Sequence, residues 1–158
     1  MKKITLAIIA TITMSLTAQA AQSKQHITIG GNQSTIDSKS GTGYDIAWGV
    51  TKVWDNGVMS DIDFNYGSVD IESETFNNFG VDVKLGYKYK RLSIYGMGSA
   101  IYQSYHEKEA AGFGFGGGAE VDLFKHLAVG ANYQTYSMTS ETNDYDYDTV
   151  KAYLKIMF

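Results

Sequence analysis

Hydrophobic and polar side chains alternate along most of the chain, which is typical of strands with one apolar and one polar face. The last residues show it most clearly. One row of alternate positions is apolar and consists of Val150, Ala152, Leu154, Ile156 and Phe158. The intervening row is mostly polar and consists of Lys151, Tyr153, Lys155 and Met157. A strand ending on an aromatic ring fits the wall of a membrane barrel, where rings lie at the lipid–water boundary.

Eight such stretches can be recognised, each close to the roughly 9–11 residues that a tilted membrane strand needs. They cover about 25–33, 43–54, 58–68, 79–89, 92–104, 112–123 and 127–136, followed by the terminal strand. Because lipid cannot hydrogen-bond an open sheet edge, the first strand should pair with the eighth. The predicted fold is therefore all-β: an eight-stranded antiparallel transmembrane up-and-down β-barrel.

The polarity of the two rows indicates which one faces lipid. The predicted outward positions hold the rings and aliphatic side chains, such as Phe64, Phe113 and Val129, whereas the inward positions hold Asp, Lys, Glu and Gly. A soluble sandwich needs the reverse, with a continuous apolar core. Period two alone does not exclude a soluble sandwich or a lipocalin-like barrel, and these remain the alternatives.

The predicted connections alternate between short and long, as in outer-membrane barrels. Three short turns lie around Asn56, Lys90 and Lys125, and Asp55-Asn56-Gly57 is a strong hairpin signal. Four longer connections, at about 34–42, 69–78, 105–111 and 137–148, should face outward and carry ten acidic residues against only Lys39 and Lys108. The short turns carry Lys52, Lys90, Arg91 and Lys125 against Asp55.

The N-terminal segment resembles a secretory signal. Lys2 and Lys3 precede an apolar stretch at 4–16, and Ala18-Gln19-Ala20 places small residues at the cleavage positions. The alternative, an anchor helix, is disfavoured because the apolar stretch is too short to span a bilayer. We therefore expect a cleaved signal at 1–20 and a barrel domain at 21–158, about 138 residues long, which is one domain's worth.

Composition narrows the possibilities further. The chain has no cysteine and no proline, so packing and backbone pairing alone must hold it, and no strand loses a ladder hydrogen bond to proline. Removal of Lys2 and Lys3 changes the formal net charge from −4 to −6, which argues against nucleic acid as a partner. Twelve tyrosines suit a membrane belt, since tyrosine is apolar at one end and polar at the other.

The chain resembles the small eight-stranded outer-membrane barrels, a group that includes the opacity-type proteins and the transmembrane part of outer membrane protein A. The resemblance is strongest in the Gly-rich stretch 112–121 and in 127–133, which look like that group's common hairpin. The terminal Phe158, Ile156 and Leu154 look like the signal read by the outer-membrane assembly machinery. The resemblance implies a location in the cell outer membrane, and it identifies architecture better than activity.

An eight-stranded barrel is just wide enough for side chains to fill it. Buried charges persist when they are paired, so we expect a lumen network in which Lys84, Lys151 and Lys155 lie among Asp61, Asp63, Asp82 and Glu120. Inward glycines of the sixth predicted strand should leave room for Tyr95, Met97 and Tyr153 to cross. Such an interior favours a plug, and the alternative is a narrow ion path along these charges.

The functional prediction is a noncatalytic monomer with a structural or surface-interaction role through acidic external loops. Its partners would be outer-membrane lipid and lipopolysaccharide, and the assembly machinery during biogenesis. Exposed contacts are expected at Asp144, Tyr145, Asp146, Tyr147 and Asp148. A passive channel is the alternative. A lipid A-modifying enzyme is disfavoured, because Ser104, His106 and Glu107 are too close in sequence to resemble a catalytic relay.

No cofactor is predicted, and no metal site either. The alternate aspartates at 144–148 resemble the opening of a calcium loop, but Thr149 and Lys155 stand where that loop needs Gly and Glu.

Overall fold

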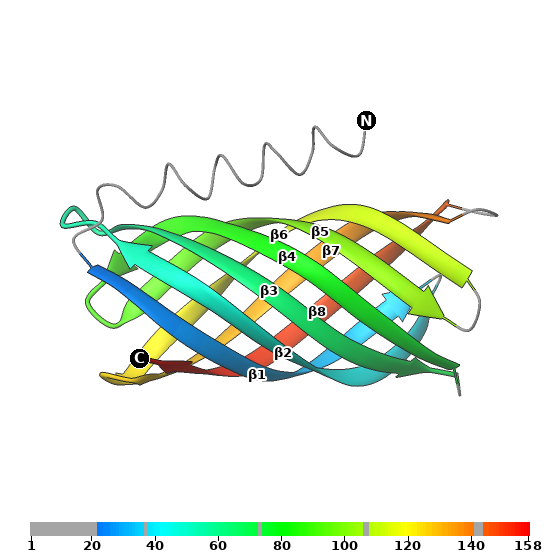
Figure 1. Cartoon of the computed structure of the whole chain (residues 1–158), viewed down its shortest axis with the longest axis horizontal. Helices are drawn as coiled ribbons and strands as arrows, with labels where there is room; N and C mark the ends of the chain where they lie inside the picture. Colours follow the sequence, from blue (N-terminus) through cyan, green and yellow to red (C-terminus); the bar gives the residue numbers. More distant parts are fainter. Residues whose placement is uncertain (1–21, 37, 73, 106–107, 141–143) are drawn as a thin grey trace.

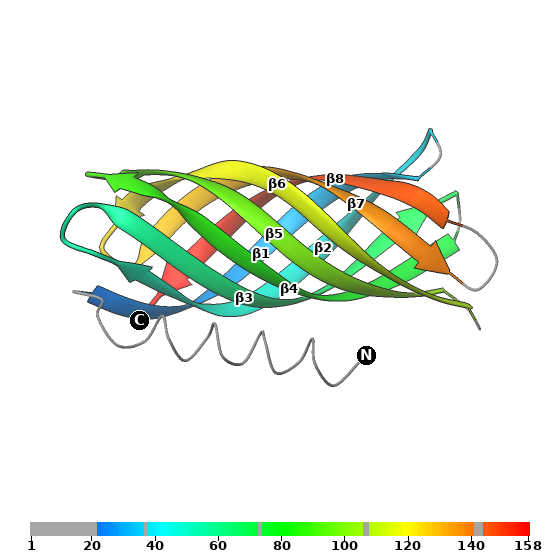
Figure 2. The same cartoon turned by 90° about the horizontal axis from the view of Figure 1, so that it is seen from above.

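The computed structural model describes residues 22–36, 38–72, 74–105, 108–140 and 144–158. The expected signal at 1–20 lies outside these residues. Eight strands make up the described chain: β1 (Gln22–Ile36), β2 (Lys39–Val53), β3 (Val58–Ile71), β4 (Glu74–Tyr89), β5 (Leu92–Tyr105), β6 (Lys108–Phe124), β7 (Leu127–Ser140) and β8 (Asp144–Met157). They run obliquely around a long barrel (Figures 1 and 2).

Each strand pairs antiparallel with the next, and β1 closes the barrel against β8. The closing ladder runs from the His26–Met157 pair to the Ile36–Tyr147 pair. Beyond the last strand, the Phe158 amide donates to the Gln25 carbonyl at 2.9 Å. This closure removes both sheet edges, so the backbone groups of every strand can be paired inside the wall. The predicted fold is confirmed, including the pairing of the first strand with the eighth.

The two faces of the wall have the predicted polarity. Phe113 and Phe115 are 70% and 72% exposed on the outside, and Trp48 stacks on Phe64 with ring centroids 6.1 Å apart. Charged side chains such as Asp61 and Lys155 are almost fully buried inside. This inside-out arrangement overturns the soluble alternatives, because their apolar row would face the lumen. Among the described residues, no helix has the length and apolar character needed to cross a membrane.

The strands are longer than the sequence pattern predicted, and the expectation of long external loops is wrong. Strands of 14–17 residues leave connections of only two or three residues at 37–38, 72–73, 106–107 and 141–143. The apolar alternation marks only the part of a strand that lies in lipid. Polar residues beyond it still pair along the ladder, so the strands continue past the roughly 9–11 residues that span the bilayer, chiefly toward the connections 37–38, 72–73, 106–107 and 141–143.

We call the two ends of the barrel the turn end and the rim end. The turn end holds the connections 54–57, 90–91 and 125–126 and both ends of the described chain, and the rim end holds the other four connections. The predicted hairpin at Asp55-Asn56-Gly57 is confirmed. The Gly57 amide donates to the Trp54 carbonyl at 2.9 Å, and Gly57 has a φ of +85°, a conformation that glycine adopts without strain.

The lipid-facing side of β5 offers a direct test of this polarity. A Cβ added to Gly98 would meet no atom within 4 Å, so a larger side chain fits there. We expect Gly98→Leu to be tolerated, whereas Gly98→Lys should lower the free energy of unfolding by about 2–4 kcal/mol, because the charge would lie in hydrocarbon. Urea unfolding of both variants in phospholipid vesicles would measure this difference, and equal stabilities would contradict the assigned face.

Candidate functional site

The half of the lumen nearer the short turns 54–57, 90–91 and 125–126 holds two lysines among three carboxylates. The register places Asp61 of β3 beside Lys84 of β4, and alternation turns both inward with Asp63. The Lys84 ammonium forms an ion pair with Asp63 and lies 3.5 Å from Asp61 Oδ1. From β8, Lys155 Nζ lies 2.9 Å from Asp61 Oδ2 and 3.3 Å from Glu120 Oε2. We call Asp61, Asp63, Lys84, Glu120 and Lys155 the charged girdle.

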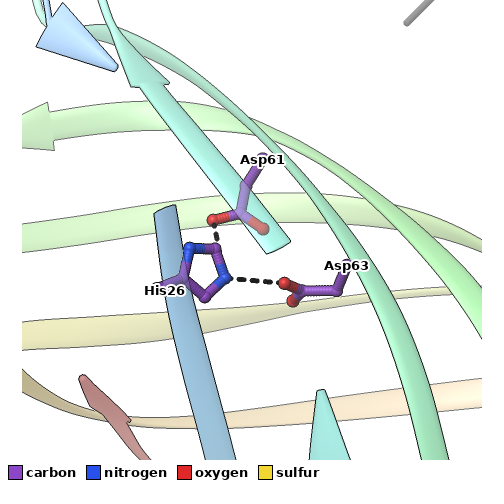
Figure 3. A group of neighbouring side chains, drawn as sticks. All are labelled: His26, Asp61 and Asp63. Carbon is purple, nitrogen blue, oxygen red and sulfur yellow. Dashed lines mark hydrogen bonds and ion pairs between the residues drawn. The ribbon is translucent and has the colours of Figure 1, made fainter. Parts of the chain in front are cut away.

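His26 of β1 lies beside the girdle and contacts it across Gly49 of β2 (Figure 3). Its ring is fully buried, and its Nε2 lies 2.7 Å from Asp63 Oδ1 and 3.8 Å from Asp61 Oδ2. The three carboxylates of the girdle exceed its two ammonium groups by one negative charge. A hydrogen bond from His26 to Asp63 offsets part of this excess, because an N–H donor stabilises the carboxylate charge.

Tyrosines and small residues fill the lumen beside the girdle. The hydroxyl oxygens of Tyr95 and Tyr153 lie 2.8 Å apart across the barrel, and the Tyr153 hydroxyl donates to Glu120 at 3.2 Å. The Lys84 Nζ lies 5.4 Å from the centroid of the Tyr95 ring and 5.8 Å from that of Tyr153. A Cβ at Gly130 would meet the Tyr153 hydroxyl at 2.4 Å, so this glycine provides the room that the tyrosine occupies.

A second polar layer lies nearer the rim end. Lys151 forms an ion pair with Asp45 of β2, a residue outside the predicted network. Asp82 accepts hydrogen bonds from Asn65 at 2.9 Å and Gln134 at 3.2 Å, so amides are its bonding partners. The structure thus brings Asp61, Asp63, Lys84, Glu120 and Lys155 together. Of the other two predicted members, Asp82 lies opposite Asp63 in the register, and Lys151 forms its ion pair with Asp45.

An apolar cap closes the lumen at the rim end. It consists of Ile101, Ala110, Tyr136, Met138 and Tyr147, with Ile36 and Tyr145 packed against it. The prediction that Tyr147 is an exposed contact is wrong, since its side chain is 2% exposed and its hydroxyl lies 2.9 Å from Ser34 Oγ. Tyr145 is half-buried and donates to Gln103 at 2.6 Å. Both tyrosines belong to a strand that alternates into the lumen rather than to a loop.

The acidic residues around the cap point outward. Asp144 and Asp146 are exposed, whereas Asp148 is half-buried and accepts a hydrogen bond from Tyr133 at 2.9 Å. Asp144 and Asp146 share this end with Asp70, Glu72, Glu74 and Glu109, which are also exposed. We call these six carboxylates the acidic rim. Most of them are carried by strands, because the strands extend through the segments predicted to be loops.

The turn end is open by comparison. A cavity of about 340 Å³ enters the lumen there and reaches Ser93, Glu120 and Lys155. This volume holds on the order of ten water molecules at about 30 Å³ each. Deeper in the barrel, a space of only about 30 Å³ lies between Asp45, Gln134 and Lys151. The lumen is therefore a cup that water can enter from one end and that narrows beyond the girdle.

His26, Asp61 and Asp63 are of the types that bind metals, and their ligand atoms lie within 4.8 Å of one another. The ammonium groups of Lys84 and Lys155 already contact the same two carboxylates. A divalent ion would have to displace these lysines or lie beside their positive charges, which is unfavourable in a buried site. The geometry therefore favours ion pairing over metal binding here.

The residues considered for catalysis are only partly covered by the structure. His106 and Glu107 lie outside the described residues, and Ser104 is a half-buried position on β5.

Sequence reasoning missed two members of the lumen network. Asp45 and His26 are both absent from the predicted network, although the structure buries them in the lumen. Alternation alone could have placed both residues in the network. Ile27, Ile29 and Ile46 lie in the outward rows of β1 and β2, so the neighbouring His26 and Asp45 must point inward. The identity of each partner depends on the stagger between strands, which alternation does not provide.

Comparison with known proteins assigns the family. The family model for the outer membrane protein beta-barrel domain matches residues 6–158. The chain therefore belongs to this family of outer-membrane barrels, and the predicted location in the outer membrane is confirmed. No curated protein matches the chain in sequence.

Several solved barrels share the fold at low sequence identity. Neisserial surface protein A is 10% identical with a TM-score of 0.60, and the match covers 88% of this chain and 99% of that one. Ail of Yersinia pestis, in complex with the heparin analogue sucrose octasulfate, is 14% identical with a TM-score of 0.56 over 86% and 97% of the two chains. The N-terminal barrel of Pseudomonas aeruginosa OprF is 10% identical with a TM-score of 0.50 over 87% and 100%.

The girdle can be tested by removing one of its cations. We expect Lys84→Ala to lower the free energy of unfolding by about 3–5 kcal/mol, because Asp63 would lose a buried ion-pair partner. The control Lys39→Ala removes an exposed pair with Glu72 and should change it by about 1 kcal/mol or less. Urea unfolding in vesicles measures both. Adding Asp63→Asn to Lys84→Met should recover stability, and an unchanged Lys84→Ala midpoint would contradict the network.

Proposed function

We propose that this barrel is a noncatalytic surface protein whose lumen is closed and whose acidic rim contacts basic partners outside the cell. Short turns and both termini lie on the periplasmic side in barrels of this kind, so the turn end would face the periplasm and the rim end the exterior. The proposal rests on how charge is distributed between the interior of the barrel and its rim. Paired charges fill the interior, whereas unneutralised carboxylates gather at the rim.

The closed lumen follows from two barriers in series. The girdle fills the half of the lumen nearer the turn end with side chains that are at most 5% exposed, and the apolar cap lies between the girdle and the rim. An ion crossing the barrel would have to break buried ion pairs and then pass an apolar constriction, where water is disfavoured. The turn-end cavity is the observation that favours the alternative, a narrow channel, because it hydrates one side of the girdle.

The acidic rim supplies the surface chemistry. Its six carboxylates are exposed, and Lys39, which pairs with Glu72 at 2.7 Å, offsets one of them. Such a field attracts positively charged surfaces and suppresses wrong partners by like-charge repulsion. The same fold in Ail accompanies a bound sulfated ligand. A polyanion of that kind would be repelled by this rim, so we expect the barrel to differ from Ail in its binding.

The other proposed partners are outer-membrane lipid, lipopolysaccharide and the assembly machinery. Leu154, Ile156 and Phe158 form part of the exposed outer row, where they are accessible to lipid and, during biogenesis, to the assembly machinery. Lipopolysaccharide phosphates would approach the acidic rim through bridging divalent cations, since both surfaces are negative. We propose that the barrel acts as a monomer in this setting.

The closed lumen can be tested in planar bilayers. We expect the wild-type barrel to show no discrete openings, because the girdle and the cap both block the path. Tyr147→Ala weakens the cap alone and should also stay closed, since the girdle remains. Steady, discrete openings in the wild type would overturn the closed lumen and favour the passive channel.

The rim can be tested with model polyions. We expect barrels in nanodiscs to bind polylysine and not heparin, and the binding to weaken as salt is added. Neutralising Glu74, Glu109 and Asp144 to the corresponding amides should reduce polylysine binding at least about fivefold, if each charge contributes a fraction of a kcal/mol. The matched control is Asp55→Asn at the turn end, which should bind as the wild type does. Equal binding by the rim variant would contradict the proposed surface.

A further inference from the structure

The turn end carries a charge opposite to that of the rim. Four cationic side chains lie there: Lys24, Lys90, Arg91 and Lys125. We call them the basic collar. Among the described carboxylates of this end, Asp122 is paired with Lys88 at 2.6 Å, and Asp55 is exposed. The collar therefore keeps a net positive charge.

The exposed cations of the collar lie in two of the three connections at the turn end, whereas the connection between β2 and β3 carries Asp55. Lys90 and Arg91 form the connection between β4 and β5, and Lys125 lies in the connection between β6 and β7. Lys24 of β1 donates to the Lys125 carbonyl at 3.4 Å and lines the cavity at the turn end. Lys90, Arg91 and Lys125 are exposed, so their charges are presented to whatever surrounds the barrel at this level.

The surroundings of the collar match a membrane interface. The Lys90 Nζ lies 5.2 Å from the centroid of the Tyr89 ring, and that ring is 62% exposed on the outer face. Phe124, next to Lys125, is 71% exposed. Aromatic side chains at the edge of the apolar band mark the boundary between hydrocarbon and headgroups. A lysine that lies along such a ring holds its ammonium at headgroup level.

We propose that the basic collar binds the phosphates of anionic phospholipids in the leaflet at the turn end. Lysine and arginine attract anionic headgroups at this level, and the fork of Arg91 suits a phosphate with two parallel hydrogen bonds. Because its three exposed cations lie in two separate connections, the collar can contact several anionic headgroups at once rather than one soluble molecule. The inference rests on the proposed orientation of the barrel and is independent of what the rim binds.

The test compares lipid selectivity in bilayers of phosphatidylcholine and phosphatidylglycerol. Spin-labelled lipids report which headgroup is held at the barrel surface. We expect the wild type to prefer phosphatidylglycerol, and the triple variant Lys90→Gln, Arg91→Gln, Lys125→Gln to lose this preference at least about fivefold, which corresponds to about 1 kcal/mol for one basic residue near the surface. Added salt should reduce the wild-type preference as well.

A control variant tests whether the lipid preference depends on the turn end, and inorganic phosphate tests whether the bound anion is a lipid headgroup. Lys39→Gln removes a cation at the rim end and should keep the wild-type selectivity. Equal selectivity in the wild type and the triple variant would overturn the proposal, as would the same loss in Lys39→Gln. Competition by inorganic phosphate without any lipid preference would also overturn it, since it would identify a soluble anion as the ligand. Should the triple variant fail to fold, Arg91→Gln with Arg91→Lys as its conservative partner gives the same comparison.

Discussion

The need to pair every backbone group within lipid is the constraint from which the rest of this structure follows. Hydrocarbon offers no hydrogen bonds, so the sheet must close, and the β1–β8 ladder closes it. Eight strands then fix a lumen that side chains can fill. Because the outer face takes the apolar row, the polar row must fill this lumen. Charges such as Lys84 and Asp63 are thus enclosed by the wall, and they are tolerated there because they are paired.

Sequence alone predicted most of this fold, because period-two alternation reports directly which face of a strand meets lipid. The outward placement of Phe113 and the hairpin at Gly57 needed no structural knowledge. The strand ends beyond the membrane were not predictable in the same way. In water both faces of a strand can be polar, so the alternation fades although the ladder continues. Tyr147 shows the consequence, since a residue read as loop is a buried member of β8.

The sequence predicted that charged side chains pair inside the lumen, but it did not predict which residues form each pair. Alternation turned Asp61, Lys84 and Lys155 inward, and the width of the barrel required partners for them. Which carboxylate meets which lysine depends on the stagger of strands around the barrel, because long side chains reach across several strands. Lys151 meets Asp45 rather than a predicted partner for this reason. His26 and Asp63 lie in one row with Gly49 of β2 between them, and this glycine leaves the space in which they meet.

With the interior closed as proposed, the two ends of the barrel would be chemically independent. Opposite charges within the lumen largely neutralise one another, and the apolar cap separates them from the rim. Each end therefore presents its own net charge to its own surroundings, negative at Glu74 and Asp144 and positive at Arg91 and Lys125. Charges separated by the length of the barrel are screened from each other by salt. With both proposals, such a barrel would hold its position in the membrane through one end and leave the other free for recognition, so that the recognition surface could change without disturbing the core.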